Sequence, residues 1–129
     1  MTDLLHIEGL RVVAGPKELL AGVDLQVQAG ECVALVGDSG AGKSLIARAA
    51  LGILPTGLRA EADLHRVLGR DMRGASERDW QGVRGVEAGY VHQDALGALD
   101  PLMRVGAQTA ATLRRHRLGR RAERATAAE

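Results

Sequence analysis

The chain has 129 residues, 17 Lys and Arg side chains and 16 Asp and Glu side chains, which leaves a formal net charge of +1. This balance gives no electrostatic reason to expect a nucleic acid or an anionic membrane as the main partner. Hydrophobic residues make up 46% of the sequence and charged residues 26%, which is typical of one folded globular domain. The single cysteine, Cys32, excludes a disulfide within the chain and a cysteine cluster for zinc.

The first part of the chain predicts an antiparallel pair of strands. Residues 4–12 alternate partly between apolar and polar side chains, and residues 19–27 alternate more regularly. Gly15-Pro16-Lys17 lies between them and predicts a turn. The N-terminus has no basic segment followed by an apolar one, so we expect no signal peptide and a reducing, cytoplasmic setting.

The next segments predict a buried strand followed by a helix. Residues 32–36 form a continuous apolar run, as expected of a central parallel strand covered on both faces, with Cys32 as a small core residue. Residues 43–51 have helix-forming side chains, and the helix is expected to end at Gly52. Its predicted apolar face carries Leu45, Ala49 and Leu51.

Weaker signals follow along the rest of the chain. Ser76 and Asp79 have the spacing of a capping box, which predicts a short helix with Trp80 as a local packing residue. The remaining expected elements are strands at 63–68 and 86–92, a turn at Asp100-Pro101 and a helix from Val105 to about Arg117. His6, His65 and His116 show no metal-ligand spacing, so we expect surface or strand roles for them.

The strongest motif lies between the predicted buried strand and the helix. Residues 37–44, GDSGAGKS, match the phosphate-loop (P-loop) pattern G-x-x-x-x-G-K-[ST]. Glycines let the loop curl so that backbone N–H groups point at phosphates, and the helix adds its N-terminal donors and dipole. The motif predicts that Lys43 reaches the β- and γ-phosphates of a nucleotide and that the Ser44 hydroxyl binds Mg²⁺. The predicted nucleotide-binding set is Gly37, Asp38, Ser39, Gly40, Ala41, Gly42, Lys43, Ser44 and Leu45.

The segment from Tyr90 to Gln108 resembles one family of P-loop proteins. It contains Gln93-Asp94 after a predicted strand, then Leu99-Asp100-Pro101, then Val105-Gly106-Ala107-Gln108. This order is similar to that in the ATP-binding subunits of ABC transporters, and within them to the dipeptide, oligopeptide and nickel import group. The resemblance extends over essentially the whole chain.

This resemblance implies an α/β fold, the N-terminal part of an ABC-type P-loop nucleotide-binding domain. Residues 1–100 are then the ATP-binding core with an antiparallel β subdomain, and residues 101–129 begin the helical subdomain. Gln93 takes the place of the Q-loop glutamine, whose amide is expected to contact Mg²⁺ or the attacking water. Lys43 and Gln93 are accordingly the expected catalytic residues of a transport-coupled ATPase.

The resemblance also implies partners and a location. ATP and Mg²⁺ are the expected cofactors, and membrane-spanning permease subunits and a second nucleotide-binding subunit, identical or different, are the expected partners. Contact with the membrane is expected only through the permease, at the cytoplasmic face of the cell membrane, and no nucleic-acid partner is expected. Dipeptides, oligopeptides and nickel remain open as the transported substrate.

Several residues depart from the family pattern. The family stacks an aromatic ring on adenine from the first hairpin, whereas this chain has Val12, Val13 and Ala14 there, with Val13 as a candidate apolar substitute. His92 replaces a commonly apolar residue, and Ala95 replaces a common proline. The family's Leu-Ser-Gly-Gly signature and its Asp–Glu pair do not occur in these 129 residues, so we expect a truncated chain without catalytic competence of its own.

Three other interpretations compete with this one. A module that binds nucleotide without hydrolysing it is the main alternative. The Asp71-Met72-Arg73-Gly74 segment matches the D-x-x-G pattern of GTPases, but the guanine-recognition motif needs an asparagine and the chain has none. ABC ATPases of DNA repair or translation are disfavoured because the segment from Gln93 to Gln108 is more similar to importers. The arginine-rich region 101–129 is either a solvated helical face or a partner surface.

Overall fold

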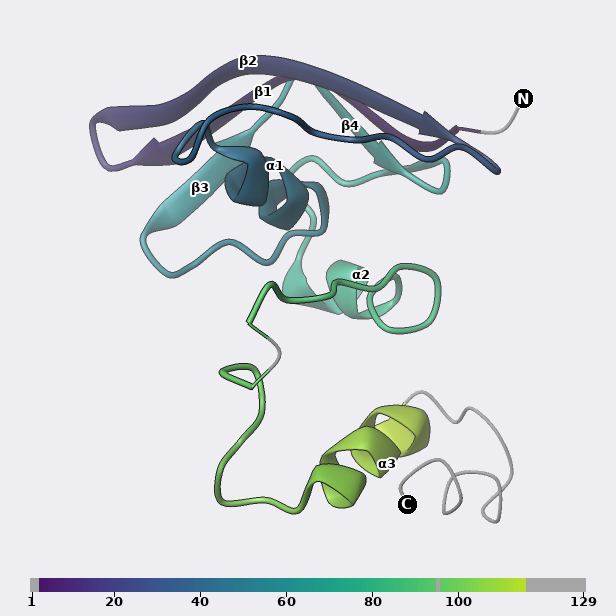
Figure 1. Ribbon diagram of the computed structural model, residues 1–129. Helices are drawn as coiled ribbons and strands as arrows, with labels where there is room; N and C mark the ends of the chain where they lie inside the picture. Colours follow the sequence, from purple (N-terminus) through teal and green to yellow (C-terminus); the bar gives the residue numbers. More distant parts are fainter. Residues whose placement is uncertain (1–2, 95, 116–129) are drawn as a thin grey trace. The chain divides into compact units, whose positions relative to one another are not determined.

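In a computed structural model of the chain, residues 3–94 and 96–115 are described (Figure 1). They divide into two compact units, up to Gly82 and from Val83 onward, and each unit is considered by itself. The strands are β1 (Asp3–Ala14), β2 (Lys17–Gln28), β3 (Leu58–Glu61), β4 (Leu64–Val67) and β5 (Arg70–Asp71). The helices are α1 (Lys43–Ala50), α2 (Glu77–Gln81) and α3 (Val105–Arg115). None of these helices has the length and hydropathy needed to cross a bilayer.

The first unit is an antiparallel sheet built around β1. The expected hairpin is confirmed: β2 pairs along one side of β1, from Asp3↔Gln28 to Ala14↔Lys17. The other side of β1 is shared, since β4 pairs with residues 5–8 and β3 pairs with residues 11–14. The resulting order is β2-β1-β4-β5, with β3 beside β1.

A bulge at Gly9 explains why the alternation in β1 is only partial. Gly9 has φ +61°, and the register with β2 shifts between Ile7 and Leu10. The extra residue lets Ile7, Leu10 and Val12 all be fully buried although their spacing changes from odd to even. The side chain of Asp24 holds the bulge by accepting a hydrogen bond from the Gly9 N–H at 2.7 Å.

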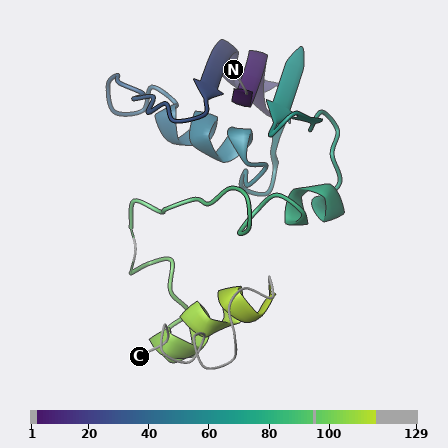
Figure 2. The same ribbon diagram turned by 90° about the vertical axis from the view of Figure 1, so that its right-hand side faces the viewer.

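Helix α1 packs under one face of this sheet (Figure 2). Its buried residues are Ile46, Ala49 and Ala50, so the apolar face is turned by about one residue from the predicted Leu45, Ala49 and Leu51. They join Ile7, Leu10, Val12 and Leu20 in one hydrophobic cluster. Gly52, with φ +63°, follows the helix and ends it as predicted.

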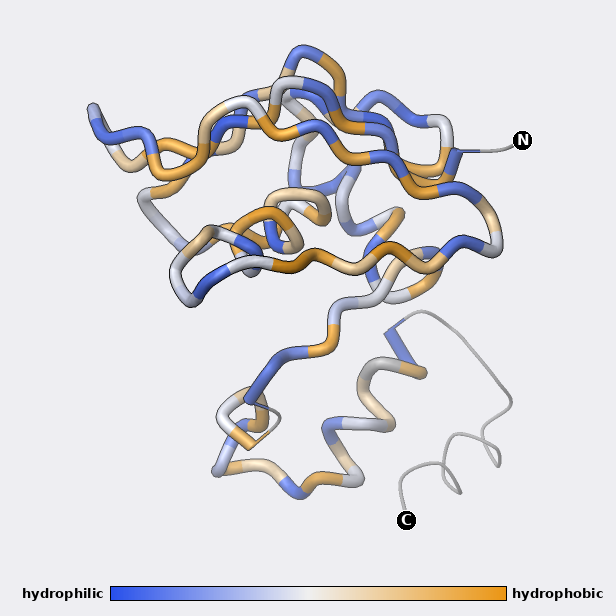
Figure 3. Tube along the Cα trace, turned by 45° about the horizontal axis from the view of Figure 1, so that its top comes forward, coloured by the Kyte–Doolittle hydropathy of each residue, from blue (hydrophilic) through white to orange (hydrophobic). Residues whose placement is uncertain are grey.

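The prediction of a buried strand at residues 32–36 is wrong for this structure. The segment lies outside the sheet, and its hydrophobic residues form one of the orange stretches of the tube in Figure 3. Val36 is 90% exposed, and Cys32 is exposed as well, so Cys32 is not a core residue. A strand covered on both faces needs hydrogen-bonded neighbours. Among the described residues, none of β1 to β5 pairs with this segment.

The strand predicted at residues 86–92 is also absent from the described part of the second unit. Residues 83–88 form a turn instead, in which the Glu87 and Ala88 N–H groups donate to the Val83 carbonyl. An isolated bridge joins Arg84 and Ala88. The strand at 63–68 is confirmed as β4, whereas β3 and β5 had no recognised signal. The C-terminal helix is confirmed as α3 up to Arg115; residues 116–129, with His116 and most of the arginine-rich tail, lie outside the described residues.

Candidate functional site

The loop from Gly37 to Ser44 connects the exposed segment 32–36 to α1. Gly40 and Gly42 have φ of +84° and +88°, a left-handed conformation that side chains other than glycine rarely adopt. The Ala41 N–H donates to the Asp38 carbonyl at 3.2 Å and closes a turn in the loop. Gly42 lies against β2, because a Cβ there would be 3.0 Å from Leu20 Cδ1. The glycines therefore allow both the curl of the loop and its approach to the sheet.

Lys43 is the charged centre of this loop. Its Nζ donates to the carbonyl of Gly37 at 2.7 Å and to the carbonyl of Asp38 at 2.6 Å. An ammonium group has three N–H donors, so one remains for a ligand while the two loop carbonyls fix its position. Asp38 contacts Lys43 through its backbone carbonyl oxygen, and Asp38 is an exposed residue.

The N-terminus of α1 supplies further donors. Gly42 is the N-cap, no side chain caps the helix, and the first intrahelical bond runs from the Ile46 N–H to the Gly42 carbonyl at 3.0 Å. The N–H groups of Lys43, Ser44 and Leu45 therefore have no acceptor within the helix. The Ser44 residue is exposed, and Ser39, Gly40 and Ala41 are exposed as well. Oriented N–H donors beside one ammonium group suit a phosphate chain.

Gln93 lies in the second unit, so its expected approach to the P-loop stays a prediction. It is exposed and follows Tyr90 and His92, whose rings meet edge to face with centroids 4.8 Å apart. Asp94 Oδ1 then accepts a hydrogen bond from the Gly97 N–H at 3.0 Å, which closes a turn. Ala95 lies outside the described residues.

The Leu-Asp-Pro turn and the Gln108 side chain form one hydrogen-bonded unit. Gln108 Oε1 accepts from the Asp100 N–H at 2.9 Å, and Gln108 Nε2 donates to the carbonyls of Asp100 at 2.9 Å and Met103 at 3.0 Å. Asp100 Oδ1 accepts from the Leu102 N–H at 2.8 Å. This geometry explains the spacing of the motif, because the side-chain amide of Gln108, eight residues after Asp100, bonds the backbone of the turn that contains Pro101.

The aromatic position of the first hairpin is filled by small aliphatic residues. Val12 is fully buried and pairs with Leu20, the residue that Gly42 approaches. Ala14 shares that face of β1 by alternation, whereas Val13 lies on the opposite face, paired with Glu18 and Arg59. The base contact expected from Val13 stays a prediction, and Ala14 is the aliphatic residue that shares a face of β1 with Val12.

The D-x-x-G segment is used locally. Arg73 Nη2 pairs with Asp71 Oδ2 at 2.6 Å, and its Nε contacts both carboxylate oxygens, which lowers the pKa of Asp71 to about 2. Arg73 Nη1 also donates to the Asp63 carbonyl at 2.8 Å. Met72 is buried and Gly74 has no side chain, so the polar side chains of this segment are Asp71 and Arg73, which pair with each other. No group of three or more His, Cys, Asp and Glu side chains able to hold a metal occurs among the described residues.

A P-loop at the start of a helix, beside an antiparallel sheet, places the chain in the P-loop class of proteins. The chain belongs to the ABC transporter family, whose model matches residues 20–128. It is 35% identical to an oligopeptide transport ATP-binding protein, OppD, of Mycobacterium bovis, over 100% of this chain and 22% of the relative.

Two further relatives have similar names. Identity is 33% to a dipeptide transport ATP-binding protein, DppD, of Lactococcus lactis, covering 89% of this chain and 33% of the relative. Identity is 37% to a probable D,D-dipeptide transport ATP-binding protein, DdpD, of Escherichia coli, covering 88% of this chain and 35% of the relative. The chain thus spans between about a fifth and about a third of the length of the curated relatives it matches. The family expected from the P-loop and from residues 90–108 is confirmed.

Proposed function

We propose that this chain is the nucleotide-binding part of an ATP-binding subunit that powers an ABC importer for peptides. The observation that carries the proposal is the P-loop itself, in which two loop carbonyls hold the Lys43 ammonium beside the N-terminal donors of α1. The names of the relatives support peptides as the cargo class, and nickel stays an open alternative.

The P-loop residues bind the triphosphate by charge and by backbone donors. The remaining side-chain N–H of Lys43 reaches the β- and γ-phosphates, while the backbone N–H groups of Lys43, Ser44 and Leu45 at the start of α1 donate to the phosphate chain. Mg²⁺, when bound there, would neutralise charge on the phosphates. The Ser44 hydroxyl is the ligand from this loop, and Gln93 is the second ligand or the residue that orients water, as the resemblance implies.

The partners follow from the role of such subunits. We infer a permease at the cytoplasmic face of the cell membrane and a second nucleotide-binding subunit, identical or different. The loop after Gln93 is the proposed permease contact, since Leu96 and Leu102 are 82% and 94% exposed there. Membrane contact is made only through the permease, and no nucleic acid takes part.

The alternative is a module that binds nucleotide without hydrolysing it. The 129 residues contain Lys43, Ser44 and Gln93 but no Leu-Ser-Gly-Gly segment. For residues 1–129 purified alone we therefore expect MgATP binding without turnover above that of the Lys43→Ala variant. Turnover that depends on Lys43 would exclude the non-hydrolysing module.

Titration with a fluorescent ATP analogue tests the proposal, and the two lysines of the chain provide matched variants. Lys43→Ala removes the ammonium that faces the phosphates, so affinity should fall by at least about tenfold. Lys17→Ala removes the same charge from the exposed start of β2 and should change affinity by less than about twofold. Equal losses in the two variants would contradict the P-loop assignment.

A further inference from the structure

The C-terminal end of α1 is fixed by a side chain from the sheet. Helix ends leave carbonyl groups without intrahelical donors. Here the Ile53 and Gly52 N–H groups donate to the carbonyls of Arg48 and Ala49, at 2.9 and 3.1 Å. The Ala50 carbonyl is instead 3.1 Å from Nε2 of His65, which is 5% exposed on β4.

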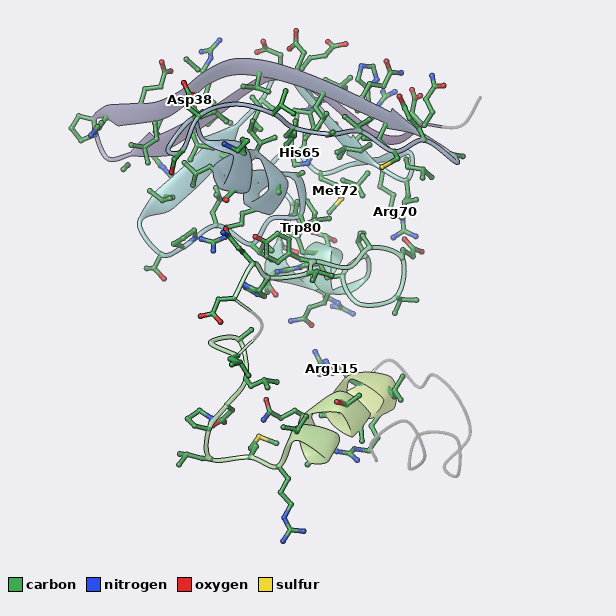
Figure 4. The ribbon with its side chains drawn as sticks, in the orientation of Figure 1. Asp38, His65, Arg70, Met72, Trp80 and Arg115 are labelled. Carbon is green, nitrogen blue, oxygen red and sulfur yellow. The ribbon has the colours of Figure 1, made fainter. Side chains whose placement is uncertain are left out.

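Trp80 holds the same helix end from α2. The indole lies against Gly52 so closely that a Cβ there would collide with the ring, and Trp80 is 7% exposed. Its ring also meets the His65 ring, with centroids 5.6 Å apart and planes at 55°. Figure 4 shows His65, Met72 and Trp80 gathered between the sheet and α2. His65, Trp80 and Gly52 are called the α1 dock below.

Both side chains of the α1 dock come from well-fixed backbone. His65 lies opposite Ile7 in the sheet, and its carbonyl accepts from the Met72 N–H at 2.8 Å. Trp80 follows a complete capping box, in which Ser76 and Asp79 bond each other's backbone N–H groups. The α1 dock therefore fixes the C-terminal end of α1, and Gly42 and Lys43 lie at the other end of this eight-residue helix.

We propose that His65 and Trp80 are positioning residues for nucleotide binding, because they fix the tilt of α1 and so aim its N-terminal donors at the phosphates. The inference rests on the proposed function. A helix of eight residues is about 12 Å long and moves as one body. Tilting it displaces the first-turn N–H groups, and hydrogen bonds weaken steeply as distance and angle depart from their optimum. A pre-aimed loop avoids the cost of ordering these donors when the nucleotide arrives.

Three variants of β4 separate positioning from mere stability. His65→Leu leaves the buried Ala50 carbonyl without its donor, so the dissociation constant for ATP should rise by about tenfold. His65→Gln keeps an N–H donor at that place and should stay within about twofold of the original chain. Val67→Ala is the matched control, since Val67 is equally buried on the same face of β4 but lies outside the hydrophobic cluster that contains α1. It should lower the melting temperature without changing affinity.

The Trp80 side of the α1 dock is tested with two glycines that have nearly the same φ. Gly52 and Gly74 have φ of +63° and +64°, but only at Gly52 would a Cβ meet the indole. Gly52→Ala should therefore weaken ATP binding more than Gly74→Ala.

Amide hydrogen exchange without nucleotide separates this inference from the proposed function. Residues 43–50 should exchange faster in His65→Leu than in His65→Gln or Val67→Ala. Unchanged exchange in His65→Leu, or equal ATP affinities for His65→Leu and Val67→Ala, would overturn the positioning role. If the original chain binds no ATP, the proposed function fails, and the exchange rates alone decide whether the dock fixes α1.

Discussion

At the scale of single residues, His65 stands out because an ionisable ring is buried in the sheet. Burial lowers the pKa of His65 below its usual value, although the hydrogen bond to the Ala50 carbonyl and the nearby Asp71 carboxylate act in the opposite direction. Arg73 and Glu61 line the same cavity of about 570 Å³ as His65 and Trp80. The folded chain therefore keeps His65 neutral at pH values where the unfolded chain protonates it.

This difference predicts a loss of stability on acidification. The unfolded chain binds a proton below about pH 6.5, so the free energy of unfolding falls as pH drops through that value, until the lowered folded-state pKa is reached. Thermal melts at pH 7.5 and 5.5 should show a larger drop for the original chain than for His65→Gln. The other described histidines are shared by both proteins and cancel in the comparison. Equal drops would show that His65 does not carry this pH dependence.

At the scale of elements, local patterns in the sequence predicted local structure well. The β1–β2 hairpin, α1, the capping box at Ser76 and the start of α3 at Val105 all depend on residues close in the chain, and all are present. The P-loop belongs to this group as well, since its glycines and its lysine act within eight residues.

Elements that depend on distant partners could not be predicted in the same way. The apolar run at 32–36 indicates a buried strand only if strands lie on both sides of it, and the described sheet offers it none. Strand β3 was not predicted for the converse reason. Arg59 and Glu61 are exposed and form no apolar pattern, and pairing with β1 makes the segment a strand. The sequence predicts that His65 lies in a strand, which is confirmed, but its bond to α1 joins residues 15 positions apart and leaves no pattern in the sequence.

We expect the Gln108 side chain to stabilise the turn before α3 by its hydrogen bonds to the backbone. Gln108→Ala removes three hydrogen bonds to Asp100 and Met103, so the Asp100 amide should exchange at least about tenfold faster with solvent. Thr109→Ala is the control, because its hydroxyl bonds only the Val105 carbonyl within the helix. Hydrogen exchange read by mass spectrometry over residues 96–104 checks this. Identical exchange in the two variants would rule out the bridging role of Gln108.

At the scale of the whole molecule, the exposed apolar segment 32–36 should make the chain self-associate. Val33 and Leu35 are 39% and 40% exposed, and an unpaired extended segment of this kind pairs readily with another chain. Leu35→Lys should therefore reduce association in sedimentation velocity runs. Leu19→Lys changes a similarly exposed leucine on β2 and should leave association nearly unchanged. A monomeric original chain at high concentration would contradict this expectation.

The central claim is that the P-loop, through the phosphates, carries nucleotide binding by this chain. Calorimetric titration of residues 1–129 with ATP, ADP, AMP and adenosine tests it most directly. Ala14, which shares a face of β1 with Val12, has no ring to stack on the base, so we expect the phosphates to supply most of the affinity. ATP and ADP should bind, and AMP and adenosine should bind at least about tenfold more weakly. Adenosine or AMP binding as tightly as ATP would contradict the claim.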